Sequence, residues 1–159
     1  MAGKQSLLKV CNFKMIFPKQ RELTFFNVET SIPGFTVGTI ESGFQSMRGK
    51  IPGDSLTYND LAVTILLDEE LKSYMEVYEA LTLAHDPIDN VLRSQEPMFD
   101  GILFITTNKN NVSFKITFFN MWIETVSDIQ FMTTSTDDNN LSFTIGTKYD
   151  YYVIEKADN

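Results

Sequence analysis

Residues 61–84 read LAVTILLDEELKSYMEVYEALTLA, and this stretch decides the fold. Its first part, Leu61–Leu67, is a short apolar run that predicts a buried strand. Asp68–Glu70 follows, and acidic residues in this position cap a helix and favour its N-terminus. We therefore expect a helix from about Glu69 to about Ala84. Its apolar residues recur mostly at three- and four-residue steps and should pack on a sheet. They are Leu71, Tyr74, Met75, Tyr78, Leu81 and Leu83.

Strand patterns flank the helix on both sides. Upstream, strands are expected at Asn12–Phe17 and Glu22–Glu29. The short turn Pro18–Arg21 lies between them, so the two strands are predicted to form an opening hairpin. Downstream, we expect strands at Gly101–Thr107, Val112–Glu124, Val126–Met132 and Leu141–Ile154, with turns at Asn108–Asn111 and Asp137–Asn140 and a bulge at Phe118–Phe119. Residues 88–99 have no steady period and predict a loop. The fold class is mainly β (α+β), an antiparallel β-sandwich or barrel with one packed α-helix.

The segment Ser31–Pro52 differs from the other strand regions. Glycine and proline recur through it between apolar positions, which breaks up core strands. We expect an extended arm that projects from the body of the protein.

Composition limits the possible functions. The 159 residues suit a single domain, here residues 1–159. A net charge of −8 argues against a basic surface that grips nucleic acid. No stretch approaches the roughly 20 apolar residues that cross a bilayer, so no membrane association is expected. Cys11 is the only cysteine, which rules out an internal disulfide and predicts a small buried side chain.

No catalytic, cofactor-binding or metal-binding residues are predicted. His85 is the only histidine and lies at the expected helix end, before Pro87, where a structural role suffices. Asp137–Asn140 is oxygen-rich but lacks the ligand spacing of a calcium loop, and a turn explains it. Asp68–Glu70 is better explained by helix capping than by paired catalytic carboxylates. Gly34, Gly38 and Gly43 lack the spacing of a phosphate-binding loop.

The order of these segments resembles the tail tube proteins of contractile-tailed bacteriophages over nearly the whole chain. The resemblance is carried first by Ile51–Asp54, leading to Leu61–Ile65, and by the acidic helix start with Tyr74, Tyr78 and Leu81. It continues in Phe119–Ile123, Val126–Phe131, Leu141–Ile145 and Tyr149–Tyr151. One departure is the sequence Ile123–Thr125, where many tube proteins carry a proline after the aromatic residue. This departure suits a specialised relative such as a tube initiator of the baseplate.

The resemblance implies a non-enzymatic virion protein. It would form hexameric rings whose inner strands join across subunits into one barrel, stacked into a tube through which phage DNA passes. Sheath and baseplate proteins would be its partners, and assembly would take place in the host cytoplasm. A net negative charge on the lumen would let DNA slide. The alternatives are a baseplate or neck ring of the same fold, a tube of a bacterial secretion system, or, from a different class, a small ligand-binding β-barrel.

Overall fold

The computed structural model describes residues 9, 11–44, 47–89, 91, 98–133 and 140–157, without the side chains of residues 42–44, 47 and 48. Nine strands and two helices occupy these residues. Their bounds are β1 Phe13–Ile16, α1 Arg21–Phe25, β2 Asn27–Thr30, β3 Phe35–Phe44, β4 Met47–Tyr58, β5 Leu61–Leu66, α2 Lys72–Ala84, β6 Phe99–Thr106, β7 Val112–Val126, β8 Ser142–Lys148 and β9 Tyr151–Lys156.

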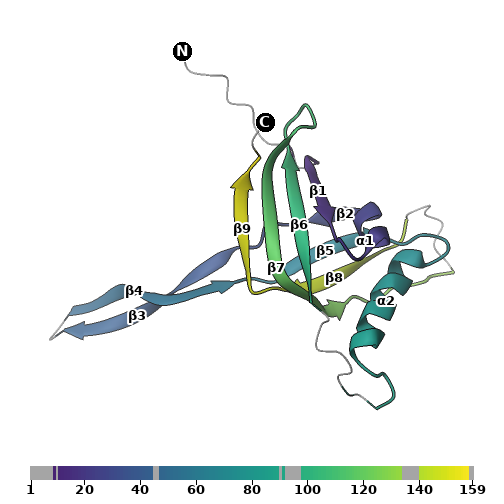
Figure 1. Ribbon diagram of the computed structural model, residues 1–159. Helices are drawn as coiled ribbons and strands as arrows, with labels where there is room; N and C mark the ends of the chain where they lie inside the picture. The colour runs from purple at the N-terminus through teal and green to yellow at the C-terminus, as the bar shows by residue number, and fades with distance from the viewer. Residues whose placement is uncertain are drawn as a thin grey trace.

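Seven strands form two antiparallel layers that share β7 (Figure 1). Sheet A contains β1, β6, the first half of β7 and β9, and sheet B contains the second half of β7, β8, β5 and β2. The remaining strands, β3 and β4, pair only with each other and project to the left of the body in Figure 1. Mostly antiparallel β structure with one main helix is therefore confirmed, and the sheet of a single chain is not closed.

A bulge in β7 lets this strand serve both sheets. Phe118 pairs with Gly101 and Met121 with Phe99, so two residues of β7 lie opposite Asp100 alone. Asn120 adopts a left-handed φ of 54°, and its backbone N–H donates to the Asp100 carboxylate at 3.2 Å. Bulges increase the local bend of a strand. The bulge predicted at Phe118–Phe119 is thus confirmed, at residues 119 and 120.

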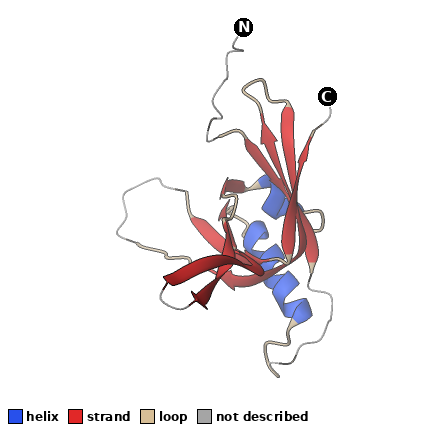
Figure 2. Ribbon diagram, turned by 90° about the vertical axis from the view of Figure 1, so that its left-hand side faces the viewer, coloured by secondary structure: helices blue, strands red, loops and turns tan. Residues whose placement is uncertain are grey.

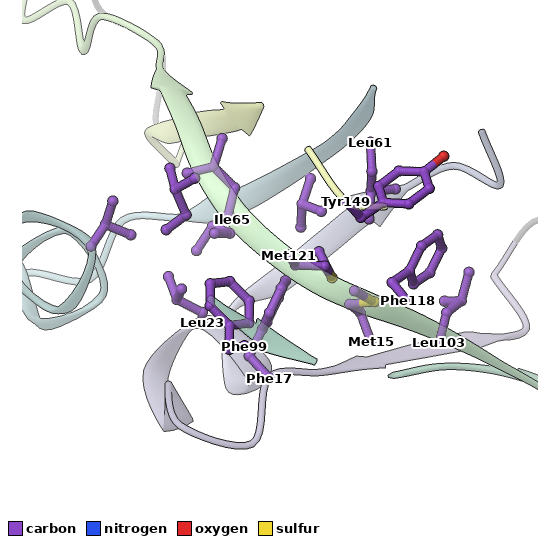
Figure 3. Close-up of a cluster of buried hydrophobic side chains, with 14 of the residues drawn as sticks. Met15, Phe17, Leu23, Leu61, Ile65, Phe99, Leu103, Phe118, Met121 and Tyr149 are labelled. Carbon is purple, nitrogen blue, oxygen red and sulfur yellow. The ribbon is translucent and has the colours of Figure 1, made fainter. Parts of the chain in front are cut away.

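The core lies between the sheets and the helices (Figure 3). The strand predicted at Leu61–Leu67 is present as β5, and it buries every second residue, starting at Leu61. Tyr74 of α2 contacts Phe143 of β8 edge to face at 5.5 Å, and Phe17 contacts Phe99 at 5.9 Å. The buried hydrophobic side chains include Met15, Phe17, Leu23, Leu61, Val63, Ile65, Val77, Leu103, Ile116, Phe118, Met121, Phe143 and Ile145.

The helix prediction is correct in place and wrong in two details. Helix α2 begins at Lys72, because Leu71 has a left-handed φ of 57°, and Asp68–Glu70 forms a turn before it. Its fully buried residues are Ser73, Val77 and Ala84, and of the predicted apolar face only Tyr74 and Leu81 pack against the core. Small side chains let the helix approach the sheet closely. As a result Met75, Tyr78 and Leu83 are among the exposed large hydrophobic residues.

Three strand predictions are wrong. The opening hairpin does not form: Glu22–Glu29 contains α1 and β2, and β1 pairs with β6 while β2 pairs with β5. Val126–Met132 is not a strand, because the Ser127 hydroxyl accepts the backbone N–H of Thr144 at 2.9 Å and ends the ladder. Leu141–Ile154 is two strands, β8 and β9, which pair with different halves of β7.

Candidate assembly interface

The arm is a two-stranded sheet, β3 and β4, that stands alone. Val37 pairs with Leu56 and Ile40 with Ile51, and all four side chains are about half exposed. An isolated two-stranded hairpin is marginally stable in water, and these half-exposed apolar side chains are available for contact with another molecule. The predicted projecting arm at Ser31–Pro52 is therefore present, and it extends to Tyr58.

A kink divides the arm near its base. Between the pairs Val37–Leu56 and Thr39–Pro52, the register shifts at Gly38. A Cβ atom on Gly53 would lie 2.8 Å from the carbonyl oxygen of Gly38, and one on Gly38 would lie 2.6 Å from the Ser55 hydroxyl. Position 53 therefore requires glycine because its neighbour is backbone, whereas a side chain at position 38 would need the Ser55 hydroxyl to rotate away. Gly38 of β3 and Gly53 of β4 therefore lie close together at the point where the outer part of the arm begins.

Aromatic side chains of the body fix the base of the arm. The Tyr149 hydroxyl donates to the backbone carbonyl of Asn59 at 2.7 Å, and the Tyr152 hydroxyl donates to that of Pro33 at 3.3 Å. The Tyr58 ring lies between them, with centroids 5.9 Å from Tyr149 and 5.2 Å from Tyr152. Burial, with smaller repulsion from Tyr152, Tyr58 and Asp60, raises the pKa of Tyr149 to about 12. The arm thus leaves the body in a direction set by the core.

Unpaired strand edges form a second candidate assembly surface. Strands β1 and β2 end the chain of paired strands, and β9 pairs on one side with β7. Between β1, α1 and β2 lies an open cleft of about 1010 Å³, lined among others by Met15, Phe25 and Val28. At its β2 side, the Asn27 amide and the Thr30 hydroxyl are buried without a hydrogen-bond partner among the described residues. Edges of this kind favour pairing with another chain.

The residues considered for chemistry do not come together. His85 is exposed and its backbone N–H caps α2 by donating to Leu81. Cys11 is exposed and lines the cleft beside β1, so its predicted burial is wrong. Gly34 lies just before β3, and Gly38 and Gly43 lie within it, so a strand and not a helix accompanies these glycines. Asp137–Asn139 lie outside the described residues, and Asn140 is exposed.

Asp68 has the structural role predicted for it. Its carboxylate accepts the Ser73 backbone N–H at 3.1 Å and the Ser73 hydroxyl at 3.2 Å, which caps α2. Glu69 and Glu70 are exposed in the turn. Within the described part of the chain, no group of three metal-ligating side chains occurs, and no helix is long and apolar enough to cross a membrane.

Comparison with known proteins gives sequence and structural relatives. No family model matches the chain. The tail tube terminator protein of Enterobacteria phage T4 is 26% identical over 153 residues, covering 91% of this chain and 87% of that protein. The tube terminating cap of the anti-feeding prophage has a TM-score of 0.69 at 16% identity, covering 99% of this chain and 100% of the cap.

Two further solved structures have the same fold. The sheath/tube terminator structure of the extracellular contractile injection system PVC has a TM-score of 0.66 at 14% identity, with 96% of this chain and 99% of that chain covered. The sheath-tube complex of the same system has a TM-score of 0.67 at 14% identity, covering 97% and 95%. The resemblance found in the sequence is confirmed by these relatives.

Proposed function

Because the chain is a structural protein of the contractile tail tube type and not an enzyme, we propose that it forms the ring that terminates such a tube. The observation that carries this proposal is the similarity to the T4 tube terminator over 91% of the chain. The terminating cap of the anti-feeding prophage adds support through its fold. The neck ring was one of the alternatives that the sequence left open, and it now takes precedence over the repeating tube subunit.

The ring is a homo-hexamer in this proposal. One of the structural relatives, at a TM-score of 0.64, is from a baseplate structure described as 6-fold symmetrised. In a closed ring, the unpaired edges of β1, β2 and β9 gain partners from neighbouring subunits, which supplies a physical drive for assembly. Phage DNA passes through the ring without sequence-specific contact. The chain works as a single domain with its arm, is part of the virion, and assembles in the host cytoplasm.

The arm attaches the ring to the tube. Its exposed Ile40 and Ile51 lie beyond the Gly38–Gly53 kink, on the part of the arm farthest from the body. Fully burying such a side chain contributes about 1.5–3 kcal/mol, and because each is already about half buried, covering the rest contributes roughly half of that. Repeated in every subunit, this contribution favours the attachment of one ring to another. Sheath and baseplate proteins complete the set of partners.

Electron microscopy tests the proposal. The purified protein should form single rings that do not polymerise alone and that bind one end of tubes made from the tail's own tube subunit. A monomer at every concentration, with bare tube ends, would refute it. The second candidate, a repeating tube subunit, is favoured by the fold shared with the PVC sheath-tube complex. Long tubes formed by this chain alone on a baseplate would establish that alternative.

The ligand-binding barrel has less support. Phenylalanines that would line a pocket, such as Phe17, Phe118 and Phe143, are fully buried in the core. The cleft beside β1 is open and includes charged Lys14, Arg21 and Glu29. Such a lining does not suit enclosure of an apolar ligand.

A further inference from the structure

An open groove lies between the start of α2 and the segment that follows β7. It has a volume of about 480 Å³, within the range of about 300–1,000 Å³ that is usual for ligand sites. In Figure 1 the arm leaves the body on the left, whereas α2 lies on the right. The side chains that shape this groove, called the α2 groove below, include Leu71, Tyr74, Val126, Asp128, Ile129 and Phe131.

The floor of the α2 groove belongs to the core, but its rim does not. Tyr74, Val126 and Ile129 are partly buried and pack against the core. Leu71 and Phe131 are 41% and 72% exposed, and neither is among the described hydrophobic residues that pack there. Packing within the subunit therefore does not account for these two large apolar side chains. Exposed apolar residues that gather at a groove mark a site of contact with another molecule.

Leu71 has a backbone conformation that folding alone does not favour. Its φ of 57° and ψ of 22° lie in the left-handed region, which is unfavourable for a residue with a Cβ atom and which glycine and asparagine adopt most readily. Leu71 occupies the N-cap position of α2 without a side-chain cap hydrogen bond, and the Asp68 carboxylate caps the helix instead. Backbone strain at an exposed residue points to a function of its side chain. Here the strained residue places an apolar group at the rim of the groove.

The surroundings of the α2 groove are acidic. Glu69 and Asp128 are exposed, and neither forms an ion pair with another described residue. Lys72, the basic residue at this end of α2, is paired with Glu70. On the other side of the groove, Val126–Thr133 contains no lysine, arginine or histidine. A complementary occupant therefore has a net positive charge.

The arm of a second copy does not have this charge. The segment Thr39–Asp54 contains two acidic residues, Glu41 and Asp54, and two basic residues, Arg48 and Lys50. These charges cancel, so an arm that entered the groove would gain little from the acidic surroundings. A different protein with a basic segment matches the groove better.

We propose that the α2 groove binds a segment of another tail protein in which bulky apolar side chains are flanked by lysine or arginine. The apolar side chains contact Leu71, Phe131 and the floor, and the basic side chains lie near Glu69 and Asp128. The proposed attachment of the arm puts the tube on the opposite side of the body, so the partner is a protein that covers the free end of the ring. This placement rests on the proposed function, whereas the binding chemistry of the groove does not.

Fluorescence anisotropy with synthetic peptides tests the chemistry of the groove. The probe is the fluorescein-labelled peptide KKFLKK, into which the full-length protein is titrated. Two matched peptides serve as controls, because KKSSKK lacks the apolar pair and EEFLEE reverses the charge. We expect KKFLKK to bind more tightly than either control by at least about tenfold, and its affinity to fall as salt is added.

Substitutions locate the binding site. Leu71→Asn should weaken the binding of KKFLKK by about threefold or more, because the leucine is already partly buried and covering the rest contributes only part of its full value. Its urea midpoint should equal or exceed that of the unmodified protein, because asparagine tolerates the left-handed backbone. Leu83→Asn, at an exposed leucine near the other end of α2, is the matched control and should leave binding unchanged. Glu69→Gln with Asp128→Asn tests the charge and should also weaken binding.

The outcomes separate this inference from the proposed ring. Equal binding of KKFLKK and KKSSKK, or equal affinity of Leu71→Asn and Leu83→Asn, would overturn the groove and leave the ring intact. A urea midpoint of Leu71→Asn well below that of the unmodified protein would assign Leu71 to folding and overturn its role in binding. Self-association that Leu71→Asn abolishes in sedimentation velocity would show that a second copy fills the groove, against the proposal. A protein that binds KKFLKK through Leu71 but forms no rings would support the groove and refute the proposed function.

Discussion

The carboxylate of Glu76 accepts a 2.9 Å hydrogen bond from the backbone N–H of Arg21, 55 positions earlier in the chain. The same carboxylate accepts the N–H groups of Glu22 and Leu23 at 3.0 and 3.1 Å. Helix α1 has no side-chain cap of its own, since Gln20 makes no such bond. Glu76 of α2 therefore caps α1 and holds the two helices in contact, with α1 above α2 in Figure 2.

Replacing Glu76 should destabilise the protein. Glu76→Ala removes the carboxylate that accepts three N–H groups in the first turn of α1, and losing a cap of this kind costs about 1–2 kcal/mol. Urea unfolding should show a lower midpoint for Glu76→Ala than for Glu79→Ala, an exposed position on the same helix. Equal midpoints for the two variants would contradict the capping role.

The lowered pKa of Asp68 predicts a loss of folding stability at acid pH. Burial raises the pKa of Asp68, but hydrogen bonds from the backbone of Ser73 and Lys72 outweigh it and hold that pKa below its ordinary value of 3.8. The stability contributed by the charged form is present above 3.8 and is lost as the pH falls through the lower folded pKa. Asp68→Asn should flatten this part of the unfolding profile. Glu69→Gln, at the exposed neighbouring residue, should leave the profile unchanged.

The raised pKa of Tyr149 predicts a loss of folding stability at alkaline pH. Its pKa in the folded protein is about 12, above the ordinary value of 10.0, so the folded state favours the neutral hydroxyl. Stability from this group is complete below pH 10 and is lost as the pH rises toward 12. Tyr149→Phe should abolish this slope and, by removing the bond to Asn59, lower stability at neutral pH by about 1 kcal/mol. Tyr78→Phe, half exposed on α2, serves as the control.

Sequence patterns predicted the elements whose signals are local. The apolar run Leu61–Leu67, the acidic turn before α2 and the glycine-rich arm were each recognisable from neighbouring residues. Helix α1 was missed because its cap comes from Glu76, far away in sequence. The break between β8 and β9 was missed because neither glycine nor proline marks it. It is fixed instead by tertiary bonds, from Asp150 N–H to Phe119 at 3.1 Å and from the Asn120 amide to the Asp150 carboxylate at 2.6 Å.

The assembly surfaces were predictable only in part. Glycines and prolines located the arm, but the tyrosines that fix its base lie in the C-terminal region and reach it only in the folded protein. The exposed residues Met75, Tyr78 and Leu83 of α2 were assigned to the core because they are larger and more apolar than Ser73 and Ala84, which are buried instead. Periodicity alone does not say which of two apolar faces a sheet will bury.

Point substitutions in the arm should separate attachment from folding. Ile40→Asp with Ile51→Asp changes one cross-strand pair of exposed apolar side chains. Because both side chains are exposed in the free subunit, rings should still form, whereas their binding to tube ends should fall by at least about tenfold, equivalent to ~1.4 kcal/mol. The matched control is Glu41→Gln with Lys50→Gln at the adjacent pair. Sedimentation with preformed tubes measures both.

Removing the outer part of the arm is the more complete test. Deleting Thr39–Pro52 joins Gly38 to Gly53, whose close approach makes a short connection feasible. The body should stay cooperatively folded, because the bonds of Tyr149 to Asn59 and of Tyr152 to Pro33 remain. The edges of β1, β2 and β9 also remain, so rings should form and stay detached from tubes in electron micrographs. Normal capping by the shortened protein would show that the arm does not carry axial attachment. An unfolded product would show that the hairpin belongs to the core, and the point variants at Ile40 and Ile51 would then decide whether it also binds the tube.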